Sequence, residues 1–92
     1  MEVKSFKITV KGMVQGVFFR ASTKEMADTL GIKGWVKNES DGSVLILAEG
    51  PADQLNQFLS WVEKGPSHAQ VSDTEKEVVD LVGYSNFKIK YF

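Results

Sequence analysis

The sequence predicts an α+β fold, a two-layer sandwich in which two helices cover one face of an antiparallel sheet. Apolar and polar residues alternate at 6–11 and again at 87–91, which is typical of half-buried strands. Between these segments lie two helical patterns, separated by a pair of strand-like runs. Because the chain has 92 residues, we expect one domain, residues 1–92, with a single core.

The first helix is expected to begin directly after Arg20. A loop with a glycine at each end, residues 12–16, follows the first strand. Ser22 and Glu25 then have the spacing of a capping box, in which each side chain satisfies a backbone amide of the first turn. Gly31 suits the left-handed residue that ends many helices. The arginine therefore stands between a glycine-containing loop and a helix.

The middle of the chain predicts a hairpin followed by a second helix. The pair Asp41-Gly42 favours a tight turn between two antiparallel strands. Pro51 is expected as the first residue of the second helix, which ends at Gly65-Pro66. The buried face of this helix has apolar residues spaced i, i+3, i+4 and i+7: Leu55, Phe58, Leu59 and Val62.

The last third of the chain has a weaker pattern. A strand is expected to start near Ala69 and Val71 and to continue through 77–79 after an irregular stretch. The order of elements is then βαββαβ, with a further short strand allowed at the end, which is the ferredoxin-like arrangement. Because domains with many functions share this arrangement, the fold alone does not assign one.

The composition excludes several classes of protein. The chain has no cysteine, which removes thiol nucleophiles, Cys-ligated metals and disulfides, and which fits a reducing cytosol. Its 11 basic and 12 acidic residues argue against nonspecific nucleic-acid binding. The first residues do not resemble a signal peptide, and no apolar run approaches the roughly 20 residues that cross a bilayer. We therefore expect a cytoplasmic protein that binds neither nucleic acid nor membranes.

The loop before the first helix is a candidate anion site. Backbone N–H groups in such a turn can form a concave nest, and the helix dipole adds positive charge. The guanidinium of Arg20 can grip two oxygens of the same anion. Gly12 and Gly16 fit neither the Walker nor the dinucleotide-binding spacing. Spacing alone leaves the alternative that the glycines only allow a turn and that Arg20 pairs with a carboxylate of the chain.

Two longer segments resemble the signatures of the acylphosphatase family. The first is GMVQGVFFR, residues 12–20, and the second is GWVKN, residues 34–38, followed by DGSV at 41–44. Further similar positions span nearly all of the remaining chain: Glu49-Gly50-Pro51, Phe58-Leu59, Trp61, Gly65-Pro66, Ala69, Val71, Phe87 and Ile89. The terminal Phe87 and Ile89 favour a free-standing enzyme over a domain of a larger carbamoyl-phosphate-handling protein.

This resemblance implies a hydrolase of acyl phosphates that uses no cofactor and no covalent phosphoenzyme. We also expect no metal, because the sequence offers no credible cluster of metal ligands. It places the phosphate-gripping arginine at Arg20 and the water-positioning asparagine at Asn38. The implied phosphate-binding backbone amides form one continuous run: Gln15, Gly16, Val17, Phe18, Phe19 and Arg20. The implied partners are a small-molecule acyl phosphate and inorganic phosphate or similar anions, and we expect a monomer.

The chemistry of this substrate explains why so few side chains suffice. The leaving group is a carboxylate whose conjugate acid has a pKa of about 4, so it departs without a general acid. Phosphoryl transfer through a loose transition state needs mainly positioning and charge stabilisation. The main alternative is a non-catalytic phosphate- or RNA-binding ferredoxin-like module, with Phe18 and Phe19 as a stacking platform.

Leu45 and Leu47 stand at strand positions that are often polar in this family. Because they alternate with Val44 and Ile46, we place them on the sheet face without helices. There they are expected to form an apolar patch prone to self-association. Trp35 is expected in the core or at its edge.

Overall fold

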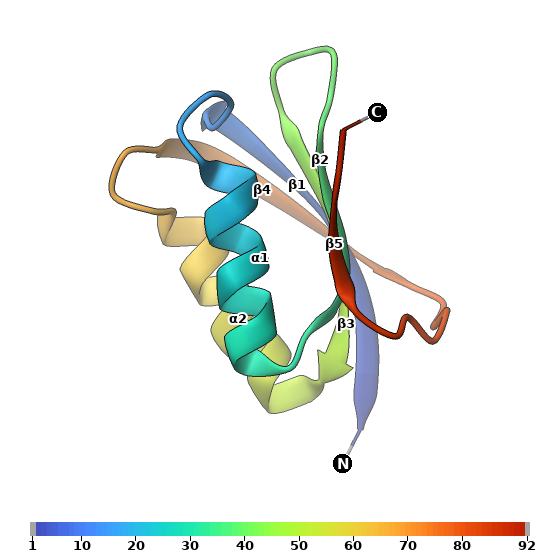
Figure 1. Cartoon of the computed structure of the whole chain (residues 1–92). Helices are drawn as coiled ribbons and strands as arrows, with labels where there is room; N and C mark the ends of the chain where they lie inside the picture. Colours follow the sequence, from blue (N-terminus) through green and yellow to red (C-terminus); the bar gives the residue numbers. More distant parts are fainter. Residues whose placement is uncertain (1, 92) are drawn as a thin grey trace.

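Five strands and two helices form two layers (Figure 1), in a computed structural model that describes residues 2–91. The elements follow in the order β1 (Val3–Met13), α1 (Phe19–Leu30), β2 (Lys33–Asn38), β3 (Val44–Pro51), α2 (Ala52–Lys64), β4 (Gln70–Val79) and β5 (Phe87–Lys90). Both helices cover the same face of the sheet (Figure 1). The predicted ferredoxin-like βαββαβ arrangement is confirmed, and the additional terminal strand is present as β5.

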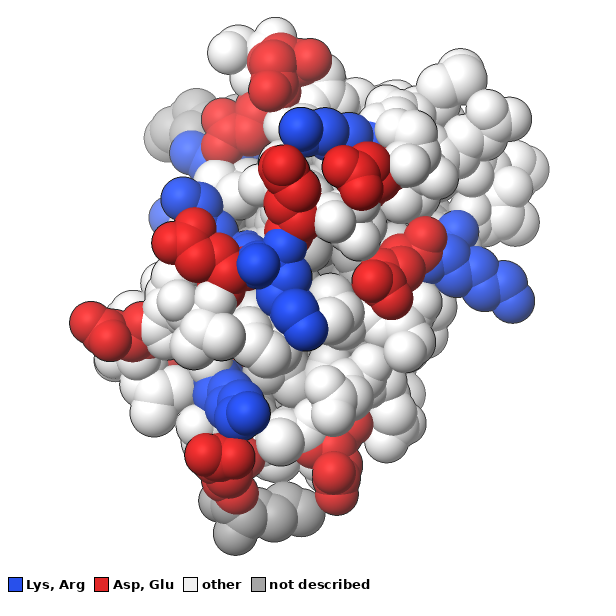
Figure 2. Space-filling model, turned by 180° about the vertical axis from the view of Figure 1, so that it is seen from behind, with Lys and Arg blue, Asp and Glu red and all other residues white. Residues whose placement is uncertain are grey.

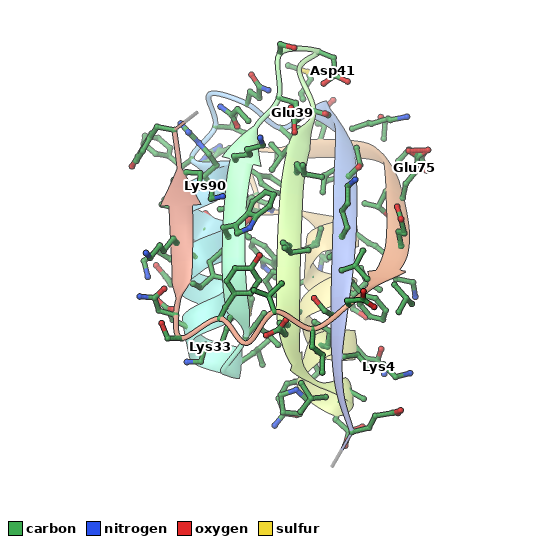
Figure 3. The ribbon with its side chains drawn as sticks, turned by 90° about the vertical axis from the view of Figure 1, so that its right-hand side faces the viewer. Lys4, Lys33, Glu39, Asp41, Glu75 and Lys90 are labelled. Atoms are coloured by element: carbon green, nitrogen blue, oxygen red, sulfur yellow. The ribbon has the colours of Figure 1, made fainter. Side chains whose placement is uncertain are left out.

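The sheet has the strand order β4-β1-β3-β2-β5. Neighbouring strands pair antiparallel, except that β5 runs parallel to β2. The sheet therefore has one parallel pair at its β5 edge, in addition to the predicted antiparallel pairs. Because β4 and β5 are the two opposite edge strands, residues 80–86 must cross the whole sheet between them. Figure 3 shows this segment crossing the helix-free face before the chain turns back along β2.

The core lies between the sheet and the helices. The predicted inward faces of β1 and α2 are confirmed, because all of their members are buried: Phe6, Ile8, Val10, Leu55, Phe58, Leu59 and Val62. Helix α1 adds Phe19 and Ala27 to this cluster. Strand β5 adds Phe87, whose ring centroid lies 6.2 Å from that of Phe58. Since burying one large apolar side chain contributes about 1.5–3 kcal/mol, this packing fixes both helices against the sheet.

Helix α1 begins at Phe19 rather than after Arg20, and the predicted capping box is wrong. Phe18 is the N-cap residue, with a φ of 60°, and no side chain caps this end. Ser22 lies inside the first turn, where its backbone N–H donates to the Phe18 carbonyl oxygen at 3.0 Å. Burial of the Phe19 side chain, which is 2% exposed, explains this earlier start. Gly31 ends the helix with a φ of 72°, as predicted.

Two other boundaries differ from the prediction. Strand β4 is continuous, because it pairs with β1 from Ser5↔Val79 to Met13↔Gln70, with one shift of register at Lys11/Gly12. Pro51 closes β3 and is the N-cap of α2 rather than its first residue. Neither difference changes the order of the elements.

A buried carboxylate holds the crossing segment against the helix-free face. Glu49 is 5% exposed and accepts hydrogen bonds from the backbone N–H groups of Val82 (2.7 Å), Gly83 (2.8 Å) and Tyr84 (3.1 Å). The hydroxyl of Tyr84 in turn accepts a hydrogen bond from the indole N–H of Trp35 at 3.2 Å. Burial raises the pKa of Glu49, but these three N–H donors outweigh it and hold that pKa below its ordinary value.

Trp35 lies on the helix-free face, outside the core cluster. Its ring is half-buried, and the ammonium groups of Lys90 and Lys37 lie 4.4 and 5.8 Å from the ring centroid. Leu45 and Leu47 are also half-buried and alternate with fully buried neighbours in β3, which puts them on this same face. Self-association of the protein through these two leucines stays a prediction.

Candidate active site

Three segments meet at one end of the sheet (Figure 1): the loop after β1, the hairpin between β2 and β3, and the end of β5. A hollow of about 270 Å³ lies there, and its lining includes both side chains predicted to act, Arg20 and Asn38. The other lining residues come from the loop, from α1 and from the last part of the chain: Val14, Gly16, Phe18, Phe19, Ala21, Ile89 and Tyr91.

The backbone of the loop is arranged to offer N–H groups. Gly16 and Phe18 both adopt left-handed conformations, with φ of 74° and 60°. No atom lies within 4 Å of the place where a Cβ on Gly16 would stand, so glycine is favoured there by conformation rather than by space. Within residues 2–91, no hydrogen bond occupies the N–H groups of 15–18. The first N–H groups of α1 add to them, since a helix leaves these without internal acceptors.

Not all of the predicted amide residues line the hollow. Gly16, Phe18, Phe19 and Arg20 do so, whereas Gln15 and Val17 are absent from its lining. The Val17 side chain packs against the core.

Arg20 has no acidic partner among residues 2–91. Its Nη1 donates to the carbonyl oxygen of Lys90 at a long 3.4 Å, and its guanidinium carbon lies 4.9 Å from the centroid of the Tyr91 ring. No Asp or Glu of the described chain forms an ion pair with it. Because a guanidinium has five N–H donors, most of this side chain's capacity remains for an anion in the hollow.

Asn38 is the last residue of β2 and is half-buried. Its side-chain Oδ1 is buried and has no hydrogen-bond partner among the described residues. A buried acceptor without a partner costs about 1–3 kcal/mol. A water molecule or a ligand in the hollow would remove this cost, so the residue is suited to hold one.

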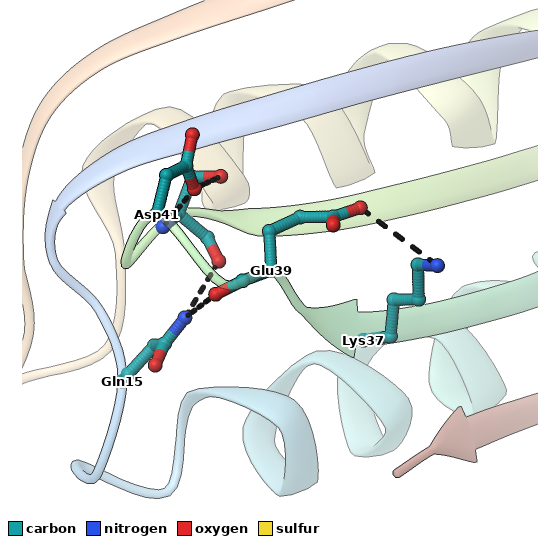
Figure 4. Close-up of polar contacts among 5 residues, drawn as sticks. Gln15, Lys37, Glu39 and Asp41 are labelled. Atoms are coloured by element: carbon teal, nitrogen blue, oxygen red, sulfur yellow. Dashed lines mark hydrogen bonds and ion pairs between the residues drawn. The ribbon is translucent and has the colours of Figure 1, made fainter. Parts of the chain in front are cut away.

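The Gln15 side chain joins the loop to the hairpin, a contact that the sequence analysis missed (Figure 4). Its Nε2 donates to the carbonyl oxygens of Glu39 and Ser43, both at 2.8 Å. These partners lie 24 and 28 residues away in the sequence. No local pattern predicts such a contact, because every residue carries a carbonyl group.

The hairpin itself is ordered by Asp41. Its carboxylate accepts hydrogen bonds from the hydroxyl and the backbone N–H of Ser43, at 2.6 and 2.9 Å. These two bonds from Ser43 hold the pKa of Asp41 below its ordinary value. The turn at Asp41-Gly42 joins two antiparallel strands, as predicted.

The stacking platform of the RNA-binding alternative is not formed. Phe18 is 81% exposed, but Phe19 is buried, with its ring centroid 6.2 Å from that of Trp61. Figure 2 shows acidic and basic side chains interspersed on the face it presents, rather than a continuous basic surface. Among residues 2–91, no group of three or more metal-ligating side chains is placed to hold a metal ion, and no helix is long and apolar enough to cross a membrane.

A model of the acylphosphatase family matches residues 6–89. An acylphosphatase of Thermotoga maritima is 48% identical over 90 residues, which cover 98% of this chain and 100% of that protein. The crystal structure of acylphosphatase from Bacillus subtilis has a TM-score of 0.92 and 40% identity, and the match covers 98% of this chain and 100% of that one.

The same domain shape also occurs inside a much longer protein. The crystal structure of full-length HypF in its phosphate- and nucleotide-bound form matches with a TM-score of 0.90 and 28% identity. That match covers 97% of this chain but only 12% of the HypF chain.

Proposed function

Since the chain belongs to the acylphosphatase family and hydrolyses acyl phosphates, we propose that Arg20 and Asn38 are its catalytic residues. The observation that carries this proposal is their common hollow, in which the guanidinium has no acidic partner within residues 2–91 and the asparagine has an unpaired buried oxygen. The small-molecule acyl phosphate binds there through its phosphoryl group.

The phosphoryl group is held by positive charge that the chain itself supplies. Arg20 lies in the first turn of α1, so its guanidinium and the positive end of the helix dipole act on the same hollow. The N–H groups of Gly16, Phe18, Phe19 and Arg20, the predicted amide residues that line the hollow, complete the cradle. Preorganised donors of this kind are worth about 3–4 kcal/mol each in the transition state.

Asn38 holds the attacking water. Its Oδ1 accepts a hydrogen bond from the water, and its Nδ2 is left to donate to a phosphoryl oxygen. Fixing the water in line with the leaving group removes part of the entropic barrier. The bond from phosphorus to the acyl oxygen breaks as the bond to water forms, which releases a carboxylate and inorganic phosphate. The carboxylate leaves as an anion, so no proton donor is required.

Three further properties belong to this proposal. Inorganic phosphate and similar anions compete with the substrate, because they present the same oxygens to the cradle. One chain supplies all of the proposed catalytic residues, so the enzyme is active as a monomer, and self-association through Leu45 and Leu47 is expected only at high protein concentration. The cytoplasmic location expected from the sequence stays a prediction.

Substitution of the two side chains tests the mechanism with benzoyl phosphate as substrate. We expect Arg20→Ala to lose at least about 100-fold in kcat and to lose inhibition by phosphate. Asn38→Ala should lose turnover by about 100-fold while inorganic phosphate still inhibits, because the cradle remains.

Matched controls are available for both substitutions. Lys33→Ala removes an exposed cation at the far end of β2 from the hollow (Figure 3), and Asn56→Ala removes an exposed amide on α2. Both controls should keep normal activity. Near-normal hydrolysis by Asn38→Ala would remove the role assigned to that residue.

A further inference from the structure

The side chain of Gln15 connects two parts of the site that the sheet does not connect. The ladder between β1 and β3 ends at the pair Val10↔Val44. Beyond Val10, β1 pairs only with β4, and it does so through the register shift at Lys11/Gly12. The chain then enters the loop at residue 14 without further pairing to the hairpin. A connection between this loop and the hairpin must therefore come from side chains.

The two hydrogen bonds of Gln15 have a defined direction. The NH2 group is the only donor of a glutamine side chain, so its Nε2 must face the carbonyl oxygens of Glu39 and Ser43. An amide nitrogen has two hydrogens, and both are used here. The side chain is half-buried, which limits competition from water.

The carbonyl groups that Gln15 contacts stand at the neck of the hairpin (Figure 4). The backbone N–H of Glu39 donates to the carbonyl of Ser43 at 2.8 Å, so these two residues close the loop of the hairpin. Asn38 directly precedes Glu39 and pairs with Val44 in the ladder. Whatever fixes this neck also fixes the backbone that carries Asn38.

We propose that Gln15 is a positioning residue whose side chain sets the distance between the phosphate cradle and the water on Asn38. The inference rests on the proposed function, which assigns phosphate to the loop and water to Asn38. Gln15 belongs to the loop by its backbone and to the hairpin by its side chain, so it links the two halves directly. Its side chain acts through Asn38 and does not itself touch the reacting atoms.

Loss of the Gln15 side chain should affect turnover and phosphate binding differently, because it frees the hairpin that carries Asn38 and leaves the phosphate-binding loop in place. Without the two hydrogen bonds, the hairpin is free to shift relative to the loop, while Arg20 and the loop amides still bind phosphate. A misplacement of about 1 Å in such a site costs about 100-fold in rate. Gln15→Met, which keeps the length of the side chain but removes its donors, should therefore lower kcat by about 10- to 100-fold. Its inhibition constant for inorganic phosphate should stay within about threefold of the wild-type value.

The experiment compares kcat and phosphate inhibition in five proteins, with benzoyl phosphate as substrate. They are the wild type, Gln15→Met, Asn38→Ala, the double variant, and Gln57→Met, which alters an exposed glutamine of α2 as a matched control. If Gln15 acts through Asn38, adding Gln15→Met to Asn38→Ala should change kcat by no more than about twofold.

Three results would overturn the inference: an unchanged kcat in Gln15→Met, an equal weakening of turnover and phosphate inhibition, or full additivity in the double variant. Failure of the proposed mechanism is visible separately, as normal turnover in Asn38→Ala alone. Should Gln15→Met unfold at the assay temperature, Gln15→Asn replaces it, because the shorter amide cannot reach both carbonyls. It should show the same loss of kcat with phosphate inhibition intact, and normal turnover in that variant would equally refute the positioning role.

Discussion

Replacement of Glu49 by glutamine tests how the crossing segment is held on the sheet. In Glu49→Gln, one carboxylate oxygen becomes an NH2 group, which cannot accept a hydrogen bond from a backbone N–H. If Oε2 is replaced, Val82 loses its acceptor. If Oε1 is replaced, Gly83 and Tyr84 lose theirs. A hydrogen bond to a charged group contributes about 1.5–3 kcal/mol and one between neutral groups about 0.5–1.5 kcal/mol. In the first case one hydrogen bond is lost and two are weakened, while the variant no longer has to bury a charge. Together these effects should lower the free energy of unfolding by about 3 kcal/mol.

The pH dependence of this loss identifies its cause. The folded protein holds the pKa of Glu49 below its ordinary value of 4.5. The ionised carboxylate therefore stabilises the fold fully above pH 4.5, and this stabilisation declines as the pH falls through the lower pKa of the folded state. The gap in the free energy of unfolding between wild type and Glu49→Gln should therefore be largest at neutral pH. It should narrow in acid, where the wild-type carboxylate becomes protonated.

Urea unfolding followed by circular dichroism, at pH 7 and at about pH 3, measures both values. Glu63→Gln, at an exposed position of α2, is the matched control and should change stability by less than about 0.5 kcal/mol. The reasoning fails if Glu49→Gln is as stable as the wild type at pH 7, or if the gap does not narrow in acid.

Three further predictions concern packing, association and metals. Gly34→Ala should lower the free energy of unfolding by more than about 3 kcal/mol, because a Cβ there would collide with the Leu47 carbonyl oxygen. Gly42→Ala, where a Cβ meets nothing within 4 Å, should lower it by only about 1–2 kcal/mol. Equal losses in the two variants, measured by thermal melting, would contradict this. Leu45→Glu should reduce self-association at high protein concentration, and a wild type that sediments as a monomer there would refute the apolar patch. Incubation with a chelator should leave hydrolysis of benzoyl phosphate unchanged, because Arg20 and backbone amides supply the charge; activity restored only by a divalent ion would contradict this.

Periodicity in the sequence determined most of the elements of this fold. The alternation in β1 and the apolar spacing in α2 predict which side chains are buried. Side chains point to opposite faces in turn along a strand and return to the same face every three or four residues along a helix, so the apolar pattern follows the buried face. The two family signatures determined the candidate residues Arg20 and Asn38 in the same way, as local strings that can be read without knowing the fold. The structure then brought both side chains into one hollow.

Tertiary structure decided the features that depend on distant partners. Helix α1 starts at Phe19 because that ring packs into the core, which overrides the local capping signal at Ser22. The bonds of Gln15 to the hairpin and of Glu49 to the crossing segment join residues between 24 and 35 positions apart. Their partners are main-chain carbonyl and N–H groups, which nearly every residue possesses, so no side-chain pattern in the sequence marks them. Only the folded arrangement selects which of them meet.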